Sequence, residues 1–396
     1  MVTLSSRVAK LKSSSIMEIA AKAQAMKASG VDVVSLAAGE PDFNTPEAIQ
    51  KAATQAMADG ITKYTPAAGF LALREVLAEK ITRENKFPVT PEEIIVTSGA
   101  KMAIYLALQC LVDEGDTVLV PTPAWVSYRP MIELNGANMV PLPLFEEDGF
   151  SLNVDRWKGL AIPANAKGIL INSPNNPSGV VFSAEELKKF VGWALQRNLW
   201  IMSDEIYEKI LYDGAEHVSV ASLGPEVRNH CITISGFSKS HCMTGWRLGW
   251  AVANRELIQK MAALQSQSVS HVTSFVQWAA IAAAKLPDSI VEEMVVEFDK
   301  RRKYCMGRLD QLSAYCTYVR PTGAFYFYVN FTKWCKEHGK NDVDLCKDLL
   351  TDAHVAAVPG SSFGKENFVR LSYANSPANL EKAFDRLEKF LKQGPK

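Results

Sequence analysis

The sequence lacks a surplus of charge of either sign, because its 396 residues include 43 basic and 43 acidic side chains. Proteins that neutralise nucleic-acid phosphates normally carry a basic surplus on the binding face, so this balance argues against a nucleic-acid partner. Long hydrophobic runs are missing too. The most apolar stretch, Phe275 to Ala284, is interrupted by Gln277 and is too short to cross a bilayer. We therefore expect neither nucleic acid nor membrane among the partners.

The sequence also lacks the cysteine patterns of disulfide-bonded or zinc-binding proteins. The seven cysteines are odd in number and form no C-x-x-C pair, which is typical of reduced thiols rather than a disulfide framework or a zinc site. We expect no metal. Residues 1–15 have no apolar segment like that of a secretory signal, so the expected location is cytoplasmic. With 47% hydrophobic residues the chain can bury a sizeable core, as soluble globular proteins do.

The middle of the chain alternates short β-branched runs with helical segments. Strands are predicted at Ile94–Thr97, Thr117–Val120, Gly168–Asn172, Trp200–Met202, Ile232–Ile234 and Leu248–Ala253. Strands separated by helices of about 10–15 residues indicate βαβ units and a mostly parallel sheet.

Helices and a second domain are predicted on either side of this region. Ser15 with Glu18, and Ser183 with Glu186, match the capping-box pattern that opens a helix. After about residue 290 a charged helix, a strand-like region at residues 317–329 and two more helices are expected. We interpret this part as a smaller α+β domain joined by the N-terminal helix.

Polar clusters follow four of the predicted strands. They are S-G-A-K at 98–101, S-P-N-N-P-S-G at 173–179, S-D-E-I-Y at 203–207, and S-G-F-S-K at 235–239, which leads to G-W-R-L-G at 245–249. Each alone can be a turn, a helix cap or a surface charge. In a parallel sheet, however, all four converge on one crevice. A lysine, a carboxylate, an arginine and a helix N-terminus there predict a phosphorylated cofactor that the lysine binds covalently.

The order of these motifs, ending in F-V-R-L-S-Y-A at 368–374, resembles the class I aminotransferases, and within them the bacterial branch of aspartate aminotransferases. The resemblance runs from Ala38 to Arg370. It implies an α/β fold, the pyridoxal-phosphate (PLP)-dependent transferase fold type I, with a mostly parallel central sheet, helices on both faces and a smaller α+β domain. It also implies three segments: residues 1–48 as N-terminal arm and helix within the small domain, 49–290 as the large PLP-binding domain, and 291–396 as the C-terminal small domain.

The resemblance implies three catalytic residues. Lys239 is expected to form a Schiff base with PLP and then to move the substrate proton. Asp204 is expected to pair with the protonated ring nitrogen, which makes the cofactor an electron sink. Tyr207, together with Asn176, is expected to bind the cofactor's phenolic oxygen.

Further cofactor contacts follow from the same resemblance. Those expected at the phosphate are Ser98, Gly99, Ala100, Ser238 and Arg247. The family often has a hydroxyl at the position of Gly236, and whether Ser235 replaces it stays open. Trp125 is expected to stack on the ring. Tyr64 is expected to reach the phosphate of a neighbouring subunit, which implies a homodimer with shared active sites.

The substrates implied are small amino and 2-oxo acids. Arg370 is expected to bind the α-carboxylate, where Asn176 and Trp125 also make contact, and Gly39 permits close backbone approach. Lys101 is expected to bind the side-chain carboxylate of a dicarboxylic substrate. Ile16 is apolar where a polar residue would help to bind a dicarboxylate, so aromatic or prephenate-like substrates stay open.

These expectations lead to a hypothesis: a transferase of amino-acid metabolism that passes the amino group of L-aspartate to 2-oxoglutarate, giving oxaloacetate and L-glutamate. A broader aromatic or prephenate aminotransferase is the nearest alternative. A carbon–sulfur β-lyase shares most cofactor residues, although Lys101 argues against it. A PLP-binding transcription regulator is disfavoured, since the first motif begins by about residue 36 and leaves no room for a DNA-binding domain.

Overall fold

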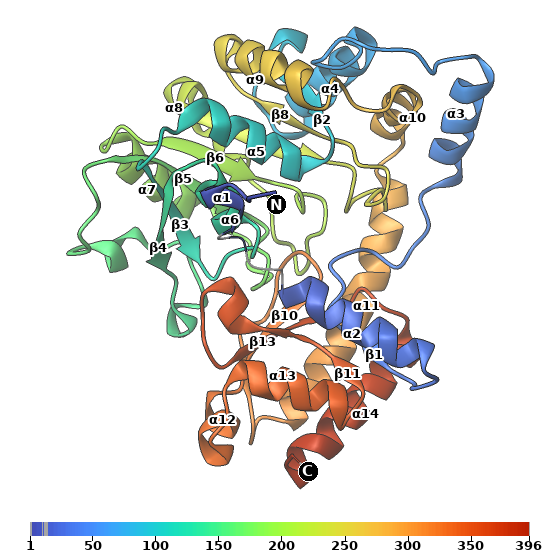
Figure 1. Ribbon diagram of the computed structural model, residues 1–396, viewed down its shortest axis with the longest axis vertical. Coiled ribbons are helices and arrows are strands. Elements are labelled where there is room, and N and C mark those ends of the chain that lie inside the picture. Colours follow the sequence, from blue (N-terminus) through green and yellow to red (C-terminus); the bar gives the residue numbers. More distant parts are fainter. Residues whose placement is uncertain (1, 10, 12–14, 396) are drawn as a thin grey trace.

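The computed structural model describes residues 2–9, 11 and 15–395. The larger part of the molecule is built on a seven-stranded sheet in the order β2-β8-β7-β6-β5-β3-β4 (Figure 1). Its strands are β2 (Ile94–Thr97), β3 (Thr117–Thr122), β4 (Asn138–Pro143), β5 (Ala166–Asn172), β6 (Trp200–Asp204), β7 (Cys231–Gly236) and β8 (Gly249–Val252). Only β8 runs antiparallel to its neighbours, so the prediction of a mostly parallel sheet is confirmed.

The strand β4 was not predicted from the sequence. Its residues read N-M-V-P-L-P, and a proline cannot donate a hydrogen bond to a neighbouring strand. The structure places β4 at the edge of the sheet, beside β3, where one side needs no partner.

Both faces of this sheet are covered by helices. Ile169 and Ile171 of β5 belong to a buried cluster with α4, α7 and α10, whereas Leu170 between them belongs to a cluster with α5, α6 and α9. The helices of this part are α3 (Glu47–Ala58), α4 (Leu71–Glu84), α5 (Ala100–Leu111), α6 (Tyr128–Leu134), α7 (Ala184–Leu195), α8 (Pro225–His230), α9 (Arg255–Ser268) and α10 (Ser274–Lys285). The capping box predicted at Ser183 and Glu186 opens α7 and is confirmed.

A smaller part is built on the antiparallel sheet β12-β13-β10-β9. Its strands are β9 (Thr317–Tyr318), β10 (Tyr326–Asn330), β12 (Val358–Pro359) and β13 (Phe368–Ser372). The long helix α11 (Ser289–Gln311) runs into it from the larger part (Figure 1). Where two further helices were expected there are three, because the short α12 (Thr332–His338) precedes α13 (Asp342–Thr351) and α14 (Pro377–Gln393).

The N-terminal segment contains α1 (Ser6–Ala9), α2 (Ser15–Ala28) and β1 (Val34–Ser35). α2 and β1 pack against the C-terminal segment, whereas α1 is drawn beside α6 of the larger part (Figure 1), and Leu11 lines a pocket there. β1 pairs in parallel with β11 (Val355–Ala356), and α2 contacts β11 and β12. These contacts support the division that we propose: residues 1–48 with 291–396 as the small domain, and 49–290 as the large one.

Short 3-10 helices occur in connecting segments, at Pro91–Glu93, Glu146–Asp148, Val154–Trp157, Val220–Leu223 and Gly360–Phe363. The seven cysteines are free thiols. Among the described residues, no helix combines the length and the apolar character that a membrane span requires.

Candidate active site

A cavity of about 360 Å³ lies where the carboxyl ends of the large-sheet strands face β10 and β13 of the small sheet. Since β8 is antiparallel to both β2 and β7, β2 points in the same direction as β7, and the four polar clusters meet at one edge as predicted. The predicted site residues that line this cavity are Gly39, Ala100, Lys101, Trp125, Asn176, Asp204, Tyr207, Ser238, Lys239, Arg247 and Arg370.

Three predicted residues are not in the cavity wall. The carbonyl of Ser98 accepts a 3.4 Å hydrogen bond from Arg247 Nη2, so it lies directly behind the wall. Gly99 has a φ of 84°, and a Cβ atom there would lie 2.4 Å from Arg247 Nη2, so glycine is required for this close approach. Tyr64 is 90% exposed and contacts the ring of His271 edge-on, away from the cavity of its own chain.

Asp204 is the last residue of β6 and is buried in the cavity floor. Its Oδ2 accepts a 2.6 Å hydrogen bond from the hydroxyl of Tyr128, and its Oδ1 accepts one of 3.3 Å from the amide of Ile206. Burial raises the pKa of this carboxyl to about 6, because removal from water disfavours the charged form. Asp204 is therefore an acid that titrates close to neutral pH.

Lys239 follows β7 and points into the same cavity. Its Nζ donates a 2.5 Å hydrogen bond to the carbonyl of Gly39. Burial lowers the pKa of Lys239 to about 8, and the charges of Arg370 and Arg247 act in the same direction, against that of Glu40. A fraction of the amine is therefore unprotonated near neutral pH and can act as a nucleophile or base.

Arg370, on β13, is the buried cation of the small-domain wall. Nη1 donates to Asn176 Oδ1 at 3.1 Å, and Nη2 donates to the carbonyl of Ala37 at 2.7 Å. Nε is buried and has no hydrogen-bond partner among the described residues. Each Nη atom has a second proton, so the guanidinium keeps donors for an anion such as a carboxylate.

A pair of tyrosines joins the large-sheet and small-sheet parts of the molecule at the cavity. The hydroxyls of Tyr207 and Tyr326 are 2.8 Å apart, and burial raises the pKa of Tyr207 well above its ordinary value, so its hydroxyl stays protonated. The Arg370 guanidinium lies 4.5 Å from the Tyr326 ring centre. A Cβ atom on Gly39 would lie 3.1 Å from the Tyr326 hydroxyl, so glycine here preserves open space.

A second cationic group lies on the large-domain side. The ammonium of Lys101 is 4.8 Å from the Trp125 ring centre, and burial together with the Arg247 charge lowers the pKa of Lys101. Arg247 donates to the carbonyl of Thr244 at 2.8 Å. The helix α5 begins at Ala100, so its first-turn amides face this group as donors for an anion.

The structure answers the open question about Ser235. Its hydroxyl donates to Glu208 at 2.9 Å and does not line the cavity, because successive side chains of β7 point to opposite faces. A Cβ atom on Gly236 would lie 3.1 Å from the backbone of Leu248 and Gly249. Neither residue therefore places a hydroxyl in the cavity. The side chain of Ile16, in α2, lies outside the described part of the chain.

Several wall residues were not predicted from the sequence: Val126, Ser127, Tyr128, Asn172, Ile206, Thr244 and Tyr326. Asn172 had a signal, since it ends a predicted strand; its side chain donates to the Asp204 carbonyl and accepts from the Asn176 amide, both at 2.8 Å. The two tyrosines had none, because a buried tyrosine in a helix or strand looks like a core residue.

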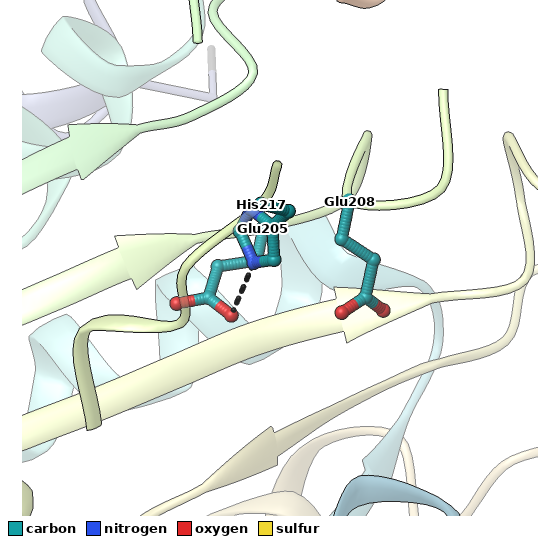
Figure 2. Close-up of side chains that lie close together, drawn as sticks. All are labelled: Glu205, Glu208 and His217. Carbon is teal, nitrogen blue, oxygen red and sulfur yellow. Dashed lines mark hydrogen bonds and ion pairs between the residues drawn. The ribbon is translucent and has the colours of Figure 1, made fainter. Parts of the chain in front are cut away.

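One cluster of possible metal ligands lies outside the cavity wall. Ligand atoms of Glu205, Glu208 and His217 are within 4.8 Å of one another (Figure 2). Glu205 already accepts hydrogen bonds from Ser203, Ser219 and the Val220 amide, and it contacts His217 Nε2 at 3.1 Å. Glu208 accepts from Ser235 and Asn85. Both carboxylates are thus satisfied by protein donors, and we interpret the cluster as a structural network.

Comparison with known proteins gives concordant matches over the whole chain. Residues 31–387 match the family described as aminotransferase class I and II. A probable aspartate/prephenate aminotransferase of Aquifex aeolicus is 44% identical over 392 residues, which are 98% of this chain and 99% of that protein. An aspartate aminotransferase of Geobacillus stearothermophilus is 44% identical, covering 98% of both chains. The structure of Thermus thermophilus aspartate aminotransferase with maleate matches with a TM-score of 0.93 at 40% identity, covering 98% of this chain and 100% of that one.

Proposed function

Because the chain belongs to the class I and II aminotransferases, we propose that it transfers the amino group of L-aspartate to 2-oxoglutarate, giving oxaloacetate and L-glutamate. The observation that carries this proposal is that Arg370 and Lys101 line the cavity that contains Lys239. A dicarboxylic amino acid has two carboxylates, and each needs a cation. The names of the relatives from Geobacillus and Thermus support the same substrate.

We propose pyridoxal phosphate as the cofactor, and the residues fit it. An aldehyde needs an amine, which Lys239 offers with a pKa of about 8. A protonated pyridine nitrogen needs a carboxylate as its partner, and Asp204, with a pKa of about 6, offers one that is mostly ionised at neutral pH. A phosphate needs backbone amides, hydroxyls and a cation as partners. The N-terminus of α5, Ser238 and Arg247 offer these. Gly99, just before α5, has no side chain that would collide with Arg247.

When bound, pyridoxal phosphate supplies an aldehyde that condenses with amines and a ring that accepts electrons from the substrate's α-carbon. Lys239 would hold the aldehyde and, once released, take the proton from the α-carbon and return it to the cofactor side. Asp204 would keep the ring nitrogen protonated by charge pairing. The hydroxyl of Tyr207 and the amide of Asn176 would bind the phenolic oxygen, and Trp125 would cover the ring.

The substrate would be oriented by its carboxylates. Arg370 would bind the α-carboxylate with its remaining donors, as bidentate guanidinium–carboxylate pairs do. Lys101 would bind the distal carboxylate. Since 2-oxoglutarate also has two carboxylates, the same two cations would serve both half-reactions.

We further propose a cytoplasmic homodimer. Tyr64 and neighbouring apolar side chains are exposed on this chain, among them Met57, Leu71, Val269 and Trp278. A second copy would cover them, and Tyr64 would then reach the phosphate site of the partner.

An aminotransferase of broader specificity is the second candidate. The relative from Aquifex is named for prephenate as well as aspartate. The cavity also carries aromatic walls, with Trp125, Tyr128, Tyr207 and Tyr326 in its lining. An aromatic or prephenate-derived side chain could pack there.

The cofactor assignment is tested with borohydride, which fixes an amine–aldehyde adduct covalently. We expect the reduced adduct at Lys239 by peptide mass mapping and no adduct in Lys239→Ala. An unchanged reducible adduct in Lys239→Ala would refute the assignment.

A further inference from the structure

We propose that Tyr128 is a positioning residue: its hydroxyl keeps the Asp204 carboxylate ionised and fixed in orientation at the floor of the cavity. The proposal rests on the proposed function, in which Asp204 pairs with the cofactor's ring nitrogen. No motif drew attention to Tyr128 in the sequence. It is the first residue of α6 and approaches Asp204 from another element of the fold.

The contact between the two residues is short and buried. Tyr128 Oη lies 2.6 Å from Asp204 Oδ2, and the two residues are 1% and 4% exposed. Burial, followed by the Asp204 charge, raises the pKa of Tyr128 well above its ordinary value. The hydroxyl therefore remains a donor at every working pH. A hydroxyl–carboxylate hydrogen bond of this length is charge-assisted and stabilises the anion over the neutral acid.

Asp204 needs this donor because its surroundings favour the neutral acid. Burial is the main cause, and the electrostatic effect of the neighbouring Glu205 acts in the same direction. Glu205 is itself buried and is held in place beside His217 (Figure 2). Against them stand the Tyr128 hydroxyl, the Ile206 amide and the more distant charge of Lys239. Tyr207 also interacts with the Asp204 charge, and its raised pKa keeps its hydroxyl neutral.

Tyr128 also links Asp204 to the aromatic residue of the wall. Its amide donates to the carbonyl of Trp125 at 3.1 Å, and the two rings meet edge-on with centres 5.3 Å apart at 86°. The turn that begins α6 therefore fixes the indole of Trp125 and the donor to Asp204 as one unit. A phenylalanine at position 128 would preserve the ring contact and remove the hydroxyl alone.

The decisive experiment titrates Asp204 in the protein without cofactor. Aspartate carboxyls are labelled with ¹³C, and the Asp204 resonance is assigned by its loss in Asp204→Asn. We expect a pKa near 6 in the parent protein, a pKa higher by about one or more in Tyr128→Phe, which is tenfold or more in the ionisation equilibrium, and no change in the control Tyr105→Phe. Tyr105 is a half-buried tyrosine of α5 outside the cavity. An unchanged Asp204 pKa in Tyr128→Phe overturns the proposal.

A second measurement uses the cofactor-loaded enzyme. An Asp204 pKa raised by the substitution means that the carboxylate is lost as pH falls, so kcat of Tyr128→Phe should drop most near pH 6 and recover towards pH 9, with little change in KM. A uniform loss at all pH values contradicts the proposal, since it indicates a packing defect. Tyr128→His keeps a ring N–H donor, and we expect its profile between those of the parent and Tyr128→Phe. The carboxyl titration needs neither cofactor nor turnover, so it tests the role of Tyr128 independently of the proposed function.

Discussion

Arg370 on the small-domain sheet donates a 3.1 Å hydrogen bond from Nη1 to Oδ1 of Asn176, in the loop after β5 of the large domain. In the proposed function Arg370 binds the substrate's α-carboxylate and Asn176 binds the cofactor. The bond therefore joins the two binding functions across the two parts of the molecule. Because both side chains are buried, each fixes the orientation of the other.

This relationship predicts the effect of Arg370→Lys. Lysine keeps a positive charge but has no planar fork, so it cannot bind Asn176, the Ala37 carbonyl and a carboxylate together. We expect the substitution to remove one hydrogen bond to a charged group, which lowers transition-state stabilisation by about 1.5–3 kcal/mol. This corresponds to roughly a 10- to 100-fold fall in kcat/KM for aspartate. Steady-state kinetics measures it. Parental kcat/KM in the folded variant would contradict the role of Arg370.

Lys101 should separate dicarboxylic from aromatic substrates. In Lys101→Gln the distal carboxylate loses its cation, so kcat/KM for aspartate should fall by roughly 10- to 100-fold while that for phenylalanine stays level. Lys260→Gln, an exposed lysine of α9, is the matched control. If both substrates lost activity equally in Lys101→Gln, Lys101 would not determine specificity.

The lowered pKa of Lys239 predicts how cofactor uptake depends on pH. Only the free amine attacks an aldehyde, and its fraction rises as pH increases through the pKa of about 8. The rate at which the apoprotein forms the borohydride-fixable adduct should therefore level off above about pH 9. Glu40→Gln removes a charge that raises this pKa, so its midpoint should move to lower pH. A rate still climbing above about pH 10, as for an ordinary lysine, would show that the pKa is not lowered.

Tyr64 predicts complementation between subunits. Lys239→Ala and Tyr64→Ala subunits are mixed by reversible unfolding and assayed at limiting cofactor. If Tyr64 serves the partner's site, each hybrid dimer has one site with both residues intact. Random mixing should then restore about a quarter of the parental activity. If Tyr64 served its own chain, no site in the hybrid would be intact, and activity would not exceed the sum of the unmixed variants.

The sequence was sufficient to predict those site residues that lie at or near the end of a predicted strand. Asp204 ends the buried strand β6, and Lys239 lies three residues beyond the end of β7; a mostly parallel sheet brings such positions together. The exception, β8, is antiparallel but leaves β2 and β7 pointing the same way, so the convergence holds.

The residues that were missed carry no local pattern. Tyr128 and Tyr326 reach the cavity from α6 and β10, where an aromatic residue serves the core equally well, and only the folded positions of their hydroxyls mark them. Ser235 was ambiguous because one residue along a strand decides which face a side chain takes. The edge strand β4 was hidden by its prolines, which are tolerated only because one side of it has no partner strand.

The central claim, that this chain is an aminotransferase for aspartate, is tested most directly by a half-reaction panel. The cofactor-loaded enzyme is mixed separately with aspartate, glutamate, phenylalanine, tyrosine and cystathionine, without an oxo-acid acceptor, and the change in the cofactor's absorbance is followed. We predict that aspartate and glutamate convert the cofactor fastest, with the matching 2-oxo acid as product. Conversion by the aromatic donors or cystathionine that outpaces aspartate by a wide margin would contradict the account.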